Sequence, residues 1–216
     1  PKIIPIPKNV DHRWSEWKIK VLNSGLFFGE ELFQLQKKAL KQILEYPRSF
    51  TIVGLSTGYG KTRIPQVATT LLREAEGIDN GPTLIISPLI SLMDDQRRCW
   101  NEILNNKIEG SGGKKLNCKF LTSSGESIMN KKEIIGELLE DKIDVLCCSP
   151  ESLLKPRSSK NKDWIEAIQE MKNPFSLLVV DEAHTIADWG ASIRPEFQLL
   201  DTIKRTILRQ NPNLRV

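Results

Sequence analysis

Four short apolar runs, spaced along most of the chain, constrain the fold more than any other feature of the sequence. Each run is rich in branched residues and ends at or next to Gly, Ser, Pro or Asp, which is typical of strands buried on both faces of a parallel sheet. The runs are FTIVGL from Phe50, PTLIIS from Pro82, KIDVLCCS from Lys142 and FSLLVVD from Phe175. The sequence therefore predicts four buried parallel strands.

Segments compatible with helices lie between these strands. They are residues 64–75, 90–104, 131–139 and 164–171. Pro65 falls in the first turn of its helix, where a missing N–H is tolerated, so it does not break that helix. Weaker strand signals lie at 118–122 and from Leu214 onward. Strands that alternate with helices predict an α/β fold, in which a mostly parallel sheet carries helices on both faces.

Length and composition fit one globular domain. The chain has 216 residues, of which 39% are apolar and 27% are charged, and a chain of this length buries a sizeable core. Residues 26–216 hold all the predicted elements, whereas residues 1–25, which include Trp14 and Trp17, give no assignment. Because the chain starts without Met and ends as a new apolar segment begins, we expect it to be a piece of a longer protein. The net charge of +4 suits a polyanionic partner but is common among soluble domains.

The cysteines and the apolar runs exclude several classes of protein. The cysteines lack the paired spacing of a zinc site and are too few for a disulfide framework, so we expect reduced, mostly buried thiols. They are Cys99, Cys118, Cys147 and Cys148. No apolar run approaches the roughly 20 residues that span a bilayer, and the start of the chain lacks the apolar stretch of a signal peptide. We expect a cytoplasmic protein, or a nuclear one in a eukaryote, with no membrane contact.

A glycine-rich stretch connects the first predicted strand to the helix that follows it. Gly58 and Gly60 let the backbone aim N–H groups at phosphate oxygens, and the positive end of the helix dipole adds to the attraction. We expect Lys61 to neutralise charge on the β and γ phosphates of ATP, and the Thr62 hydroxyl to bind Mg²⁺. Leu55 stands where the usual phosphate-loop pattern begins with Gly. The expected nucleotide contacts are Ser56, Thr57, Gly58, Tyr59, Gly60, Lys61 and Thr62.

An acidic motif, DEAH, follows the last predicted strand at residues 181–184. Parallel strands present their carboxyl ends to one crevice, so Asp181 is expected to reach a magnesium ion held beside Thr62. Glu182 is then placed to orient and deprotonate the attacking water. We assign His184 to coupling between the nucleotide and nucleic-acid sites, with a capped or core histidine as the alternative. On its own, the motif could also be an acidic helix N-terminus.

The residues after DEAH carry the most specific signal. The stretch DEAHTIADWGASIRPEF, at 181–197, contains a Trp-Gly and an Arg-Pro pair. Together with the two motifs above, it resembles the RecQ-type DNA helicases over most of residues 27–216. That resemblance implies the first RecA-like lobe of a three-layer P-loop NTPase, in which Trp189 and Arg194 sense single-stranded DNA and relay it to ATP hydrolysis. Trp and Arg suit contact with a base and a phosphate, while core packing of Trp189 is the alternative. Ile193 replaces the family's usual aromatic residue.

Three further segments resemble the same family. Residues 87–96, SPLISLMDDQ, and 149–153, SPESL, are similar to its DNA-backbone contacts, for which short hydroxyls and helix N-termini are suitable ligands. The residues implied are Ser87, Pro88, Ser91, Gln96, Ser149 and Pro150. The segment FQLQ, at 33–36, is similar to the adenine-recognition motif, so Gln36 is implied to pair with the adenine edge, and a solvated helix face is the alternative. The family's Tyr and basic residue that sandwich the base are absent.

The resemblance implies an ATP-dependent DNA helicase or translocase that couples Mg²⁺-ATP hydrolysis to single-stranded DNA binding. A second RecA-like lobe of the same parent chain would supply arginines to the γ phosphate. Residues 1–216 alone are therefore expected to bind nucleotide weakly and to unwind nothing. Two alternatives stay open: an RNA helicase of the DEAH or DEAD type, and an ATP-gated DNA-binding component of a defence system that does not unwind.

Overall fold

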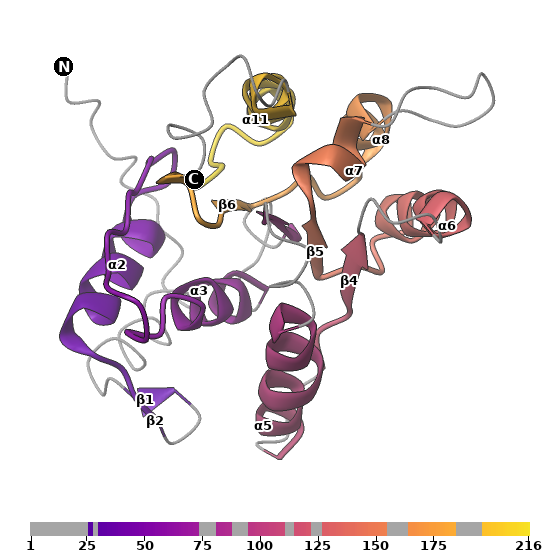
Figure 1. Cartoon of the computed structure of the whole chain (residues 1–216). Helices are drawn as coiled ribbons and strands as arrows, with labels where there is room; N and C mark the ends of the chain where they lie inside the picture. The colour runs from indigo at the N-terminus through magenta and orange to yellow at the C-terminus, as the bar shows by residue number, and fades with distance from the viewer. Residues whose placement is uncertain are drawn as a thin grey trace, which may run out of the picture.

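The centre of the molecule is a sheet of four parallel strands (Figure 1). The computed structural model describes residues 26–27, 30–73, 81–87, 95–110, 115–121, 127–154, 164–184 and 196–216. The strands are β3 (Thr83–Ile86), β4 (Cys118–Leu121), β5 (Val145–Cys148) and β6 (Leu177–Val180). Their order across the sheet is β4-β5-β3-β6. Three of the four strongly predicted strands and the weaker one at 118–122 are confirmed.

Helices cover both faces of this sheet (Figure 1). One face carries α2 (Gln34–Glu45), α3 (Arg63–Arg73) and the π-helix η2 (Arg98–Leu104), which continues into α5 (Asn105–Gly110). The other face carries α6 (Ser127–Leu139), α7 (Pro150–Leu154), α8 (Trp164–Glu170) and α11 (Glu196–Gln210). A short antiparallel pair, β1 (Leu26–Phe27) and β2 (Glu30–Glu31), precedes α2.

The core is divided in two by the sheet, because successive residues of a strand point to opposite faces. Ile85 and Val145 pack in one buried cluster with side chains of α2, α3 and η2. Leu84 and Leu146, their neighbours in sequence along β3 and β5, pack in a second cluster with side chains of α6, α8 and α11. These two cores confirm the predicted α/β fold with helices on both faces of a parallel sheet.

The predicted helices agree with the structure wherever it describes them. Pro65 lies in the first turn of α3, as expected, while residues 131–139 lie within α6 and 164–171 correspond to α8. In the predicted helix at 90–104, residues 95–97 are helical and lead into η2, and residues 90–94 lie outside the described part. None of the described helices combines the length and apolarity that crossing a membrane requires.

The segment at the end of the chain joins the sheet beside β6, in agreement with the weak strand signal from Leu214. Arg215 forms a parallel bridge with Leu177. The N–H of Leu178 donates to the Arg215 carbonyl at 2.8 Å, and the N–H of Arg215 donates to the Ser176 carbonyl at 3.1 Å. Arg215 therefore pairs with the edge of the parallel sheet at one position, beside β6.

The predicted strand over residues 50–55 is wrong, because this run forms no strand in the structure. The N–H of Thr51 donates to the Val216 carbonyl at 2.7 Å, and the N–H of Val216 donates to the Ser49 carbonyl at 3.0 Å. Among the described residues, Val216 is the only backbone partner of the run, and Ile52 is 83% exposed. A run of apolar residues favours a strand, but a strand forms only where a neighbour pairs along its length.

The four cysteines form no disulfide bond with one another. Cys118, Cys147 and Cys148 are buried and free, and Cys99 is half-buried and free. Burial raises the pKa of the Cys147 thiol to about 12, with a smaller contribution from the charge of Asp181. The prediction of reduced and mostly buried thiols is confirmed.

Candidate nucleotide-binding site

The glycine-rich loop at 56–62 leads into the N-terminus of α3, as the sequence predicts. Gly58 has a φ of 82° and Gly60 a φ of 74°, values that residues with a side chain rarely adopt. The N–H of Tyr59 donates to the Ser56 carbonyl at 3.3 Å, which closes the turn. The two glycines therefore let the chain turn tightly before α3 begins.

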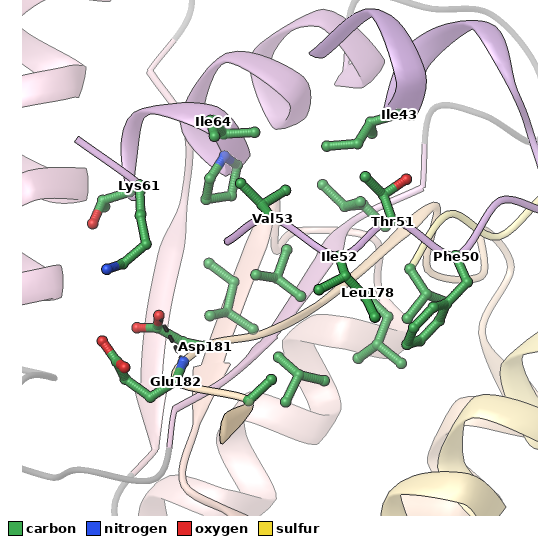
Figure 2. Close-up of a pocket in the computed structure, with 18 of the residues that line it drawn as sticks. Ile43, Phe50, Thr51, Ile52, Val53, Lys61, Ile64, Leu178, Asp181 and Glu182 are labelled. Carbon is green, nitrogen blue, oxygen red and sulfur yellow. Dashed lines mark hydrogen bonds between the residues drawn. The ribbon is translucent and has the colours of Figure 1, made fainter. Parts of the chain in front are cut away.

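Lys61 leaves this loop toward the carboxyl end of the sheet. Its Nζ donates to the Leu55 carbonyl at 3.2 Å. Figure 2 shows the same side chain pointing toward Asp181 and Glu182. The lysine therefore points into the space between the loop and the two carboxylates, where a phosphate group would need a positive charge.

Asp181 comes directly after β6, and its carboxylate is held in place. Its N–H donates to the Ile86 carbonyl at 2.9 Å, which continues the pairing with β3. One carboxylate oxygen, Oδ1, accepts from the N–H of Glu182 at 3.0 Å, and the other, Oδ2, accepts from the amide of Gln96 at 3.4 Å. Burial raises the pKa of Asp181, as does the neighbouring Glu182, while the Glu182 N–H, Lys61 and Gln96 act in the opposite direction.

Glu182 and His184 form the outer part of the acidic motif. Glu182 has a φ of 48°, a backbone conformation that is unusual for a residue with a side chain and is found often at functional sites. Its Oε2 lies 3.2 Å from Nδ1 of His184, whose side chain is 65% exposed. The core-histidine alternative is therefore wrong, and the predicted coupling role of His184 stays a prediction.

A single cavity of about 850 Å³ contains both motifs. Lys61, Thr62, Asp181 and Glu182 line its polar end. The rest of the wall is mainly apolar and comes from the run at 50–55 and from β6, as Figure 2 shows. The phosphate loop and the acidic strand end therefore meet in one cavity, as the sequence predicts, although the run before the loop forms no strand.

The oxygen atoms at the polar end suit a magnesium ion. Thr62 offers a hydroxyl and Asp181 a carboxylate, which are the hard oxygen ligands that Mg²⁺ prefers. Within the described part of the chain, no three His, Cys, Asp or Glu side chains gather as a metal-binding set. This pair of oxygen donors fits Mg²⁺, which proteins hold through one or two side chains while nucleotide phosphates and water fill the remaining positions.

Gln36 is buried in α2 and holds the phosphate loop. Its amide nitrogen donates to the Tyr59 carbonyl at 3.1 Å and to the Gly60 carbonyl at 3.0 Å, while its oxygen accepts from the N–H of Phe33 at 2.9 Å. A Cβ atom on Gly60 would lie 2.8 Å from the Gln36 nitrogen, so this contact requires glycine. The solvated-face alternative for Gln36 is wrong, and its predicted pairing with adenine stays a prediction.

An aromatic pair beside the loop was not predicted from the sequence. The rings of Phe33 and Tyr59 lie 5.2 Å apart at an angle of 51°, and Phe33 is 56% exposed. The sequence does hold one sign that Phe33 is unusual. It directly precedes α2, a position usually held by Ser, Thr, Asp or Asn rather than by an aromatic residue. An exposed aromatic face next to a phosphate loop can stack on a nucleotide base.

The predicted DNA contacts are only partly described. Ser87 and Ser149 end β3 and β5 and are buried, and their N–H groups donate to the carbonyls of neighbouring strands. Pro150 is also buried and begins α7. Gln96 contacts Asp181 at the cavity. Pro88, Ser91, Trp189 and Arg194 lie outside the described residues. Contact with DNA stays a prediction for all of them.

Comparisons with known proteins agree with this geometry. A family model described as DEAD/DEAH box helicase matches residues 33–211. The ATP-dependent DNA helicase Q-like 5 of Arabidopsis thaliana is 34% identical to this chain over 182 residues, which make up 84% of this chain and 17% of that protein. The ATP-dependent DNA helicase RecQ of Haemophilus influenzae is 30% identical over 153 residues, 71% of this chain and 20% of that protein.

A solved structure supports the same fold. The yeast DEAD-box splicing factor Prp28 has a TM-score of 0.55 and 14% sequence identity, over 92% of this chain and 42% of that one. This chain spans about a fifth of the length of the two curated relatives above. Because the family model covers most of the sequence, including both motifs of the cavity, this chain belongs to the DEAD/DEAH box helicase family.

Proposed function

We propose that this chain is the ATP-binding lobe of an ATP-dependent DNA helicase or translocase. The observation that carries the proposal is the cavity in which Lys61 and Thr62 share one polar end with Asp181 and Glu182. Phosphoryl transfer to water needs a cation for the phosphates, a magnesium ligand and a base for the water, and these four side chains supply them. The two relatives described above are DNA helicases, which favours DNA over RNA as the polymer.

Each side chain has a separate task in this mechanism. The backbone N–H groups of the loop at 56–62 bind the phosphates, and Lys61 offsets their charge. Thr62 and Asp181 would hold Mg²⁺, which neutralises charge on the β and γ phosphates when it is bound. Glu182 orients the attacking water and takes its proton. His184, 3.2 Å from Glu182, transmits the state of the nucleic-acid site to this base.

The nucleic-acid part of the proposal rests on the sequence beyond the cavity. Trp189 and Arg194 come five and ten residues after His184 and have the chemistry to stack on a base and to bind a phosphate. A second RecA-like lobe of the same protein would close over the polar end of the cavity and add arginines to the γ phosphate. Closure of this kind completes a catalytic site and makes hydrolysis depend on the bound polymer.

The choice of polymer can be tested with ATP hydrolysis by the full-length protein. We expect single-stranded DNA to raise the ATP turnover number by about tenfold or more, because coupling between sites typically changes affinity by about that much. RNA of the same sequence is expected to have a much smaller effect. Stimulation by RNA alone would contradict the DNA assignment and favour an RNA helicase. DNA-stimulated hydrolysis without strand displacement would favour the non-unwinding defence component.

The aromatic pair should contribute to nucleotide affinity. We expect Phe33→Ala to weaken binding of a fluorescent ATP analogue by about tenfold, because stacking of a base on an aromatic ring is worth about 1–3 kcal/mol. Inorganic triphosphate, which has no base, should compete equally well in both proteins. Leu35→Ala is the matched control, because Leu35 is an exposed apolar residue of the same helix. Equal nucleotide affinity in the Phe33 variant and the wild type would exclude stacking on this ring.

A further inference from the structure

The contact of Gln96 with Asp181 has a defined orientation, which Trp100 determines. Trp100 is fully buried, and its indole Nε1–H donates to Oε1 of Gln96 at 3.2 Å. An indole can only donate and an ionised carboxylate can only accept. The amide oxygen of Gln96 must therefore face Trp100, and its nitrogen must face the carboxylate of Asp181. No other rotation of the amide satisfies both partners.

The two oxygens of Asp181 are held by donors from different parts of the chain. Oδ1 accepts from the adjoining backbone N–H of Glu182, and Oδ2 accepts from Nε2 of Gln96, 85 residues away in sequence. The first donor alone would let the carboxylate turn about its bond to Cβ. The second donor fixes the plane of the carboxylate beside the negatively charged Glu182, which would otherwise push it away.

We infer that Gln96 is a positioning residue for the magnesium ligand Asp181, and that Trp100 sets the direction of its amide. The inference rests on the proposed nucleotide site and adds a residue to it. The family resemblance implied a contact with DNA for Gln96, whereas in the structure its amide is engaged by Trp100 and Asp181. Gln96 thus acts on the nucleotide site through the carboxylate of Asp181.

A magnesium titration of nucleotide affinity tests this role. The probe is a non-hydrolysable fluorescent ATP analogue, bound to the full-length protein first in EDTA and then at rising Mg²⁺. We expect Gln96→Leu to raise the half-saturating Mg²⁺ concentration by about tenfold or more, the effect of losing one hydrogen bond to a charged group. Gln96→Glu should raise it further, because the new carboxylate faces Asp181. Trp100→Phe, which removes the indole donor together with part of the buried ring, should give an intermediate value.

The affinity measured in EDTA separates positioning from a general effect on the fold. It should be unchanged in all three variants, and so should the melting temperature of Gln96→Leu. Gln66→Leu is the matched control, because the Gln66 amide donates to the Cys99 carbonyl at 3.3 Å and so joins α3 to the start of η2 away from Asp181. This control should leave the half-saturating Mg²⁺ concentration at the wild-type value.

The outcomes distinguish the inference from the proposed function. If Gln96→Leu leaves the half-saturating Mg²⁺ concentration unchanged, or lowers the EDTA affinity in parallel, the positioning role is overturned while the nucleotide site stands. If Gln96→Leu weakens DNA binding and has no effect on the Mg²⁺ titration, the side chain belongs to the DNA contact instead. If the wild type binds the analogue without any dependence on Mg²⁺, the proposed function fails and this inference fails with it.

Discussion

Replacing Glu182 with Gln is expected to lower ATP turnover by the full-length protein by about 10²- to 10⁴-fold, because an amide cannot take the proton of the attacking water. Nucleotide affinity should stay at the wild-type value, since Gln has nearly the same shape and leaves Lys61, Thr62 and Asp181 in place. Steady-state ATP hydrolysis gives the turnover number, and the fluorescent analogue gives the affinity. The variant should accumulate as a nucleotide-bound, inactive protein.

Glu133→Gln serves as the control for this prediction. Glu133 is an exposed residue of α6 and is absent from the cavity lining. The same change of a carboxylate to an amide should leave turnover unchanged there. Wild-type turnover in the Glu182 variant would mean that another group accepts the proton, and the assignment of roles at the end of β6 would then be wrong.

The strands were predictable where a segment with a strand-like sequence lies beside another strand with which it can pair. The runs from Pro82, Lys142 and Phe175 contain β3, β5 and β6, and β3 pairs along its length with each of the other two. The run at 50–55 has the same composition, yet it meets a backbone partner only at Val216. The composition of a segment indicates whether it favours a strand, whereas a strand forms only if another strand lies next to it.

The cavity could be predicted because its two motifs are local. Each is a few consecutive residues that follow an apolar run, although only the run before the acidic motif forms a strand. Contacts between distant segments could not be predicted in this way. Gln96 and Asp181 meet only because η2 packs against the sheet, and Phe33 meets Tyr59 only because α2 packs against α3. Both contacts involve side chains that look ordinary when each segment is considered alone.

The hydrogen bonds of Gln36 are another contact between distant segments that the sequence could not predict. The family resemblance indicated the right residue and the right neighbourhood. The structure adds that both hydrogens of its amide nitrogen are directed at carbonyls of the phosphate loop, at Tyr59 and Gly60. Gln36 therefore stabilises the loop itself, a role that depends on the positive φ of Gly60 and on how α2 packs.

Replacing Lys61 with Ala should have the second large effect, a loss of about 100-fold or more in affinity for the Mg²⁺-bound ATP analogue. A charged hydrogen bond to phosphate contributes about 1.5–3 kcal/mol, and each 1.4 kcal/mol is tenfold in affinity. Lys61 can make such bonds because its Nζ already lies near the loop, 3.2 Å from the Leu55 carbonyl. Equilibrium binding of the fluorescent analogue measures the loss, and circular dichroism checks that the fold is intact.

Lys204→Ala is the informative control for Lys61, because Lys204 lines the same cavity from α11 and differs from Lys61 mainly in position. Its Nζ lies 3.4 Å from the Asp201 carboxylate, which offsets its charge. If phosphate binds at the loop, only the Lys61 change should abolish binding. If the Lys204 change abolishes it instead, the phosphates bind beside α11 rather than at the loop, and the assignment of the loop at 56–62 to phosphate binding would be wrong.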